Sequence, residues 1–260
     1  MKQRIKEEAA KLGIDCCGIA NEGEKCIIVC LFPYYIDGLK GNISRYAMVP
    51  DYHIVCKKYL LQLSENLKLT DYEIYADISP YDERKLAHKA GLGVIGKNRL
   101  LINDKYGSYV FIGIIVLNSL ELEADIPINN ECLNCGRCIK SCPGKALLEQ
   151  KFIKEKCLSD ITQRKGELNL EEKRLIIKTG MVWGCDACMQ ACPMNKNILE
   201  TPIPDFKKNI ISSLYLKDFE GLSNKEFLLK YQDRAFTWRG KNVLLRNCGV
   251  LEDCLPGDKL

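Results

Sequence analysis

Seven cysteines in two spaced motifs constrain this chain more than any other feature of its sequence. The first motif is Cys132-x2-Cys135-x2-Cys138-x3-Cys142-Pro143, and the second is Cys185-x2-Cys188-x3-Cys192-Pro193. The first motif has the bacterial ferredoxin spacing, in which three cysteines hold one [4Fe–4S] cluster and the fourth reaches a second cluster. A structural zinc site also uses Cys-x2-Cys pairs, but its four ligands leave the longer run unexplained. The spacing therefore predicts two [4Fe–4S] clusters.

Ligand counting predicts the source of one further thiolate. Two clusters, each held by four cysteine thiolates, need about eight thiolates, one more than the motifs supply. The expected first set is Cys132, Cys135, Cys138 and Cys192, and the expected second set is Cys142, Cys185 and Cys188 with Cys157, which lies between the motifs. A small buried apolar role is the alternative for Cys157. In that case Cys248, Cys254 or a three-iron cluster would complete the count.

The composition is that of an ordinary globular protein. The chain is 47% hydrophobic and 28% charged, and its net charge of +4 permits a nucleic-acid partner without arguing for one. The apolar stretch Gly107–Leu120 is shorter than the ~20 residues of a bilayer span, and the N-terminus lacks a secretory apolar segment. We expect a cytoplasmic monomer without a membrane partner. The remaining cysteines carry no metal spacing and are expected to be core residues: Cys16, Cys17, Cys26, Cys30, Cys56, Cys248 and Cys254.

Hydrophobic periodicity predicts mixed helices and strands before the first cysteine motif. Helices are expected at 2–12, 51–68 and 82–90, and strands at 14–20, 26–32, 72–78, 100–102 and 109–117. This mixture predicts an α/β or α+β layered domain over residues 1–127. An inserted ferredoxin-like domain is expected at 128–200, and a helical tail at 201–260 is expected to pack on the first domain. In that tail, Ser223-x-x-Glu226 predicts the start of a helix.

Asp77 lies at the end of the predicted strand 72–78, before Ser79-Pro80, where a general acid could be placed. A turn former or a helix cap is the alternative. As an acid it should be partly buried, with a raised pKa. The following run GLGVIGK has glycines at 91, 93 and 96, but it follows a helix and is therefore no dinucleotide fingerprint. Either the close approach of a large flat cofactor or a tight helix-to-strand connection would explain these glycines.

Four segments resemble epoxyqueuosine reductases, in the same order along the chain. They are SRYAMVPDYH (44–53), ADISPYDERKLAHKAGLGVIGKNRLLI (76–102), the double cluster with KCLSDIT (156–162), and AFTWRGKNVLLRN (235–247). The resemblance implies a cobalamin-dependent enzyme with a reductive-dehalogenase-like core that reduces epoxyqueuosine in tRNA to queuosine. It also implies that Asp77 is the proton donor and that Cys157 is a cluster ligand. The implied cobalamin-binding residues are Tyr46, Asp77, Gly91, Leu92, Gly93, Gly96, Lys97, Leu101 and Ser159.

The implied electron path runs from a ferredoxin or flavodoxin, through the two clusters, to base-off cobalamin, which is reduced to Co(I). Two features depart from the family. Cys26 follows Ala20 almost at once, where the family carries several tens of residues, and the chain ends at Leu260, where the family commonly continues into a helical-repeat domain. A related corrinoid reductase acting on a small molecule, or a non-enzymatic electron-transfer protein, therefore remains an alternative. Asp51-x-His53 weakly resembles a cobalt-ligating motif, but we expect both residues to lie on a helix with an apolar face rather than to bind cobalt.

A basic stretch near the C-terminus predicts contact with nucleic acid, and the family resemblance implies that this is tRNA bearing a GUN anticodon. The residues concerned are Arg234, Trp238, Arg239, Lys241 and Arg246. Lysine and arginine neutralise phosphates, and an exposed aromatic ring can stack on a base. The alternative is a solvated helix face with a buried tryptophan.

Overall fold

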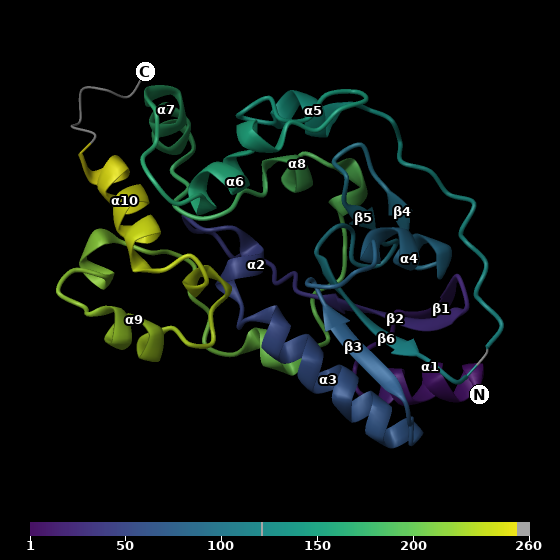
Figure 1. Ribbon diagram of the computed structural model, residues 1–260. Helices are drawn as coiled ribbons and strands as arrows, with labels where there is room; N and C mark the ends of the chain where they lie inside the picture. Colours follow the sequence, from purple (N-terminus) through teal and green to yellow (C-terminus); the bar gives the residue numbers. More distant parts are fainter. Residues whose placement is uncertain (121, 254–260) are drawn as a thin grey trace. The chain divides into compact units, whose positions relative to one another are not determined.

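The computed structural model describes residues 1–120 and 122–253, which fall into two compact units (Figure 1). Unit 1 contains Met1–Asp37, Tyr52–Cys135 and Pro193–Lys208, and unit 2 contains Gly38–Asp51, Gly136–Cys192 and the described residues from Asn209 on. Both units are assembled from separate stretches of the chain. This division differs from the predicted boundaries after residues 127 and 200. No helix in the described ranges is both long and apolar enough to cross a bilayer.

Unit 1 is built on a four-stranded sheet with the order β1-β2-β6-β3. The strands are β1 (Cys17–Glu22), β2 (Lys25–Pro33), β3 (Tyr72–Ala76) and β6 (Val110–Leu117), and each neighbouring pair is antiparallel. The two central strands, β2 and β6, are largely buried, which explains their nearly continuous apolar sequences. Helices and strands are therefore mixed as predicted. Because the sheet is antiparallel, unit 1 is α+β rather than α/β.

Helices cover both faces of this sheet. Helix α3 (Tyr52–Leu67) contacts β3 and β6 on one face, with α1 (Lys2–Lys11) packed against it, and α4 (Glu83–Lys89) contacts β1, β2 and β6 (Figure 1). Alternate residues of β2 join the core beneath α4, whereas Phe32 meets Tyr59 of α3 edge-on at 6.2 Å between ring centroids. A Cβ at Gly113 of β6 would lie 2.8 Å from Leu60, so glycine permits the close approach of α3.

Shorter elements complete unit 1. Strands β4 (Val94–Ile95) and β5 (Leu101–Ile102) form a hairpin after α4, and the short helices η2 (Pro193–Asn195) and η3 (Pro204–Lys207) follow the second cysteine motif. Asp205 of η3 forms an ion pair with Lys58 at 2.7 Å, and Phe206 contacts Phe111 at 5.4 Å between ring centroids. These contacts place Pro193–Lys208 with the sheet rather than with the cluster segment that precedes it.

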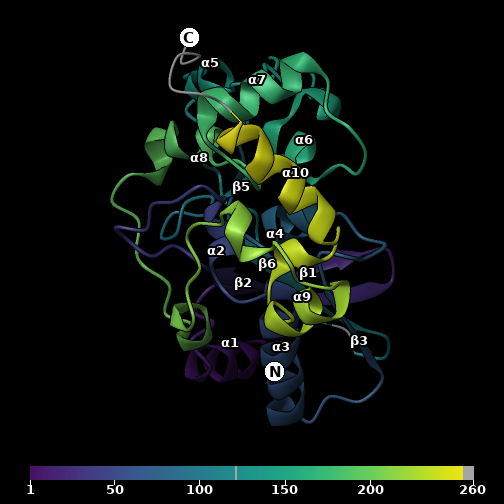
Figure 2. The same cartoon turned by 90° about the vertical axis from the view of Figure 1, so that its left-hand side faces the viewer.

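Unit 2 is mainly helical around an aromatic core that includes Trp183, Phe219, Phe227 and Phe236. Its elements are α2 (Arg45–Met48), α5 (Arg137–Ser141), η1 (Lys154–Lys156), α6 (Leu158–Gln163), α7 (Leu170–Thr179), α8 (Ala187–Gln190), η4 (Leu216–Asp218), α9 (Asn224–Lys230), η5 (Ala235–Thr237) and α10 (Lys241–Glu252). Helix α10 contacts α6 and α7, so the tail from Asn209 packs with the cluster segment (Figure 2). The predicted capping box begins α9: Ser223 Oγ accepts from the Glu226 N–H at 3.2 Å.

The cysteines outside the two motifs behave largely as predicted. Cys16, Cys17, Cys26, Cys30, Cys56 and Cys248 are all buried. Cys17 and Cys30 face each other across β1 and β2, with 3.7 Å between their sulfur atoms. Cys254 lies outside the described residues.

Candidate functional site

The four thiols expected to hold the second cluster lie near one another in unit 2. Burial raises the pKa of Cys188 to about 12, and the neighbouring charges of Cys185, Cys157 and Cys142 raise it further. Burial likewise raises the pKa of Cys185 to about 11, with Cys157 and Cys142 adding to the effect. Raised pKa values mean that forming several thiolates close together costs free energy. Bound iron offsets this cost because it binds the thiolates. This donor set fits an iron–sulfur cluster.

Backbone N–H groups point at the sulfur atoms of this set. The N–H of Ala146 donates to Cys142 Sγ at 3.2 Å. The N–H groups of Ser159 and Asp160 donate to Cys157, and that of Ala187 donates to Cys185. Hydrogen bonds to ligand sulfurs are one means by which proteins set the potential of a cluster. Within the described residues, no three His, Cys, Asp or Glu side chains are close enough to hold one metal ion.

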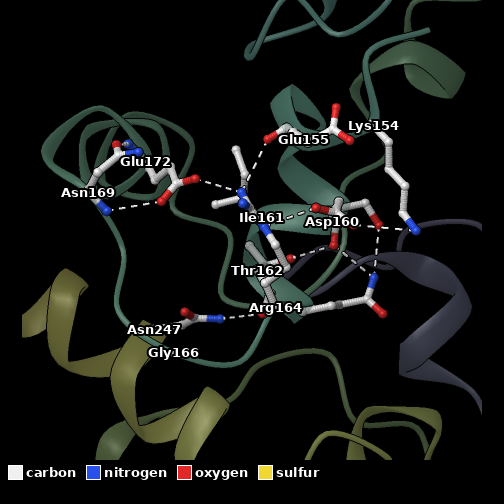
Figure 3. Close-up of polar contacts among 12 residues, drawn as sticks. Lys154, Glu155, Asp160, Ile161, Thr162, Arg164, Gly166, Asn169, Glu172 and Asn247 are labelled. Carbon is white, nitrogen blue, oxygen red and sulfur yellow. Dashed lines mark hydrogen bonds and ion pairs between the residues drawn. The ribbon is translucent and has the colours of Figure 1, made fainter.

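A polar network fixes the helix that begins just after Cys157 (Figure 3). Arg164, just after α6, forms ion pairs with Asp160 at 3.0 Å and with Glu172 of α7 at 2.6 Å. Asn247 of α10 donates to the carbonyl of Thr162 at 2.7 Å and to that of Val182 at 2.8 Å. Helix α6, which begins directly after Cys157, is thereby held by both α7 and α10.

The two cysteine motifs meet through α5 and α8, which contact each other. Ser141 Oγ donates to the carbonyl of Ala187 at 3.2 Å. Cys138 and Cys192 of the expected first set belong to unit 2, whereas Cys132 and Cys135 belong to unit 1. The structure thus brings together the second ligand set, and the first set remains a prediction from spacing.

Asp77 lies just after β3 and is held by two residues of α3. Tyr52 Oη donates to Asp77 Oδ2 at 2.7 Å, and His53 Nε2 lies 3.3 Å from the same oxygen. The bond to His53, with that to Tyr52, holds the pKa of Asp77 below its ordinary value despite partial burial. The cap of α4 is Asp82, which accepts from the Lys85 N–H, so Asp77 is not a helix cap.

The expected raised pKa of Asp77 is therefore wrong, whereas the side chain is partly buried as expected. Its side chain is 59% exposed, and its hydrogen-bond donors stabilise the charged form. The raised pKa belongs instead to Glu83 at the start of α4. Burial raises the pKa of Glu83 to about 7, although Ser79 and the Asp77 N–H lower it in part. Sequence reasoning missed Glu83, whose one signal was an acidic residue shortly after Asp77, at the start of a predicted helix.

Close contacts within unit 1 surround the glycines of the GLGVIGK run. Gly91 follows α4 with φ +70°, and a Cβ there would lie 2.6 Å from the carbonyl of Ile126. A Cβ at Gly93 would lie 2.5 Å from the carbonyl of Ile102, and one at Gly96 the same distance from Asn98 Oδ1. The tight-connection alternative accounts for Gly91 and Gly93, which approach backbone carbonyls, whereas Gly96 approaches only side-chain atoms.

The other cobalamin candidates are divided between the units. Leu92 and Leu101 are core residues beneath α4, and Lys97 is half-buried. In unit 2, Tyr46 Oη accepts from Trp183 Nε1 at 2.8 Å, and Ser159 Oγ accepts from Gln163. The buried Asn98 Nδ2 has no hydrogen-bond partner among the described residues. A ligand carbonyl could accept a hydrogen bond from this amide. Cobalamin carries amide side chains, so the Asn98 side chain is compatible with it.

The predicted nucleic-acid residues have different environments within unit 2. Trp238 is 60% exposed, which excludes the buried alternative, and Arg239 stacks on it. Together with Lys165 and Lys241 they line a cavity of about 740 Å³ that has no acidic side chain in its lining. Arg246 also lines it, but its guanidinium donates to the carbonyls of Arg164 and Gly166.

Arg234 must be removed from the nucleic-acid set. It is 2% exposed and donates to the carbonyls of Met48 and Asn209. A guanidinium enclosed in this way cannot reach a phosphate. Its role is to join two stretches of unit 2 that are distant in sequence.

Comparisons with known proteins find matches to two family models and to epoxyqueuosine reductases. Residues 131–195 match a family described as "4Fe-4S double cluster binding domain", and residues 20–78 match "Epoxyqueuosine reductase QueG, DUF1730". An epoxyqueuosine reductase of Lactococcus garvieae is 38% identical over 214 residues. The chain is thus similar to epoxyqueuosine reductases over most of its length. The aligned region covers 80% of this chain and 60% of the length of that relative.

Solved structures of the family share the fold. An epoxyqueuosine reductase from Streptococcus thermophilus superposes with a TM-score of 0.81 at 28% identity, covering 96% of this chain and 80% of the other. A second epoxyqueuosine reductase, solved with an epoxyqueuosine-modified tRNA stem loop, gives a TM-score of 0.84 at 26% identity with the same coverage. The mixed α/β fold of this chain is thus that of the family.

Proposed function

We propose that this chain is a reductase that converts epoxyqueuosine in tRNA to queuosine, using two [4Fe–4S] clusters and cobalamin. The observation that carries the proposal is the placement of Asp77. Its carboxylate is fixed by Tyr52 and His53 at a strand end, in a chain that also holds a double-cluster segment. An electron carrier has no need of a positioned carboxylate with a tyrosine and a histidine around it. Reductive opening of an epoxide does, because the departing oxygen takes up a proton.

The clusters would be held by the two sets of cysteines defined above, and they would deliver single electrons at low potential. Cobalamin, when bound, would supply a nucleophilic reduced metal centre. The amide of Asn98 in unit 1 would donate to it, and the remaining residues that would hold it are those that the family resemblance implies. A ferredoxin or flavodoxin is the proposed electron donor, and a monomer in the cytoplasm is the proposed state.

The proton is the part of the reaction that this chain's own residues control. Asp77 Oδ2 lies within hydrogen-bond distance of both Tyr52 Oη and His53 Nε2, so a proton can be held between Asp77 and His53. The Asp77 side chain is 59% exposed. Substrate that covers it would remove water, and desolvation raises the pKa of a carboxyl group. Asp77 is therefore proposed to become an acid only when substrate is bound.

The proposed tRNA surface consists of Trp238, Arg239, Lys241 and Lys165. The aromatic ring offers a stacking face, and the cations line the adjacent cavity. The relative solved with a modified tRNA stem loop supports a tRNA substrate for this chain.

The test is anaerobic reconstitution with iron, sulfide and cobalamin, followed by turnover of epoxyqueuosine-containing tRNA with a chemical reductant. The wild type should form queuosine, and Asp77→Asn should retain corrinoid and both clusters while losing most of its turnover. A protein that carries both clusters but never retains corrinoid would be an electron carrier. A protein that retains corrinoid but leaves the tRNA unchanged would point to a small-molecule substrate.

A further inference from the structure

Glu83 connects helix α4 to the loop that carries Asp77. Its Oε2 accepts a hydrogen bond from the backbone N–H of Asp77 at 3.3 Å. Its Oε1 is buried and has no hydrogen-bond partner within the described ranges. Because Glu83 is the first residue of α4, and Asp82 caps that helix, the helix fixes the position of the Glu83 backbone. The carboxyl group thus reaches back from a fixed point to the loop.

The Asp77 backbone needs such support. Its φ is +73°, in the left-handed region, which is unfavourable for a residue with a side chain because Cβ approaches the following carbonyl oxygen. A strained conformation persists only where the surrounding structure holds it. Here the side chain is held by Tyr52 and His53 of α3, and the backbone is held by Glu83 of α4. The loop is therefore clamped from two different helices.

We propose that Glu83 is a positioning residue for Asp77, holding its backbone in the left-handed conformation that directs the carboxylate to Tyr52 and His53. Glu83 acts through Asp77 and need not touch the substrate. The inference rests on the proposed function, because positioning matters for catalysis only if Asp77 delivers the proton. The hydrogen bond itself can be tested without any turnover.

The protonation state of Glu83 should change the strength of this hold. The groups that face it are the Asp77 carboxylate, the His53 ring, the Ser79 hydroxyl and the Asp77 N–H. An ionised carboxylate is a stronger acceptor than a neutral carboxyl group. Because the pKa of Glu83 is raised to about 7, the bond to the Asp77 N–H should strengthen as the pH rises through neutrality.

Amide hydrogen exchange of the full chain reads the bond directly. The variants are Glu83→Ala, which removes the acceptor, and Glu83→Gln, which keeps a neutral one. Glu65→Ala, at an exposed position on α3, is the matched control. At pH 8 the protection factor of the Asp77 amide should fall about tenfold in Glu83→Ala and less in Glu83→Gln, and it should not change in the control. Between pH 6 and pH 8 the protection should rise in the wild type and stay flat in Glu83→Gln.

Turnover adds a second readout. Glu83→Ala should lower kcat about tenfold with little change in KM, and Glu83→Gln should recover part of it. Equal protection of the Asp77 amide in the wild type and in both Glu83 variants would overturn the proposal, whatever the turnover. Loss of protection in Glu83→Ala, in a protein whose wild type does not reduce epoxyqueuosine, would support the positioning role and refute the proposed function instead.

Discussion

The guanidinium carbon of Arg239 lies 3.5 Å from the centroid of the Trp238 ring. Arg239 therefore covers one face of the indole, and Trp238 is still 60% exposed. Stacking orders the ring and places a positive charge beside it. An ordered, exposed aromatic ring next to a basic cavity is the arrangement on which the bases of single-stranded RNA loops stack.

We predict that Trp238→Ala weakens tRNA binding by about 5- to 150-fold, the range that corresponds to the loss of one stacked base. The matched control is Tyr215→Ala. Tyr215 is 51% exposed, and, as Arg239 does at Trp238, a cation lies over its ring: Lys217 Nζ is 5.6 Å from the ring centroid. Tyr215 does not line the cavity. Filter binding at two salt concentrations measures both variants. An equal effect of the two substitutions would show that the cavity is not the tRNA surface.

Arg234→Met should destabilise the fold and leave the salt dependence of tRNA binding unchanged. The substitution removes a buried guanidinium that donates to the carbonyls of Met48 and Asn209. Carbonyls left without donors cost about 1–3 kcal/mol of unfolding free energy. Urea unfolding measures the loss, and Lys241→Met serves as the comparison. A reduced salt slope in Arg234→Met, with normal stability, would return Arg234 to the nucleic-acid surface.

The sequence was sufficient for the features that depend on local pattern. Cysteine spacing identified the cluster segment, and counting pointed to Cys157, which lies near enough to Cys142, Cys185 and Cys188 to affect their pKa values or be affected by them. Periodicity found α3 and β6 to within a residue or two. These signals are local because a helix face or a strand repeats every few residues.

Features that depend on tertiary contacts could not be predicted. Arg234 and Arg239 are equivalent in the sequence, yet one is enclosed by carbonyls and the other stacks on an exposed ring. Burial of Glu83 and exposure of Asp77 depend on how α4 and α3 pack on the sheet, and this packing raises the pKa of Glu83 while the pKa of Asp77 is lowered. The reason for Gly93, contact with the carbonyl of Ile102, also becomes visible only in three dimensions.

Cys157→Ala should reduce the iron content from about eight to about four per chain, because a [4Fe–4S] cluster with three ligands is poorly retained. Cys248→Ala is the matched control. Cys248 is a buried core residue whose thiol contacts the carbonyl of Leu214, and its loss should leave the iron content unchanged. Iron and sulfide assays after anaerobic reconstitution measure both variants. Full iron content in Cys157→Ala, together with reduced iron content in Cys248→Ala, would show that Cys248 is the cluster ligand and Cys157 is the core residue.

Glu83→Gln should become more stable relative to the wild type as the pH rises from about 4.5 to about 7. In this window folded Glu83 retains its proton, whereas unfolded Glu83 has lost it. The folded state therefore binds more protons, and its stability falls with rising pH. Glutamine does not titrate, so the difference in unfolding free energy between the two proteins isolates this effect. It should grow by about 1–3 kcal/mol across the window and then level off.

Urea unfolding at pH 5, 6, 7 and 8 would measure this difference, with Glu65→Gln as the control. Glu65 is exposed, and its substitution should give a difference that does not change with pH. Asp77 contributes in the opposite sense and in a lower window. Its lowered pKa stabilises the fold above the ordinary aspartate range, and this stability is lost as the pH falls below about 4. A pH-independent difference between Glu83→Gln and the wild type would mean that Glu83 titrates normally, and the neutral carboxyl group beside Asp77 would not exist.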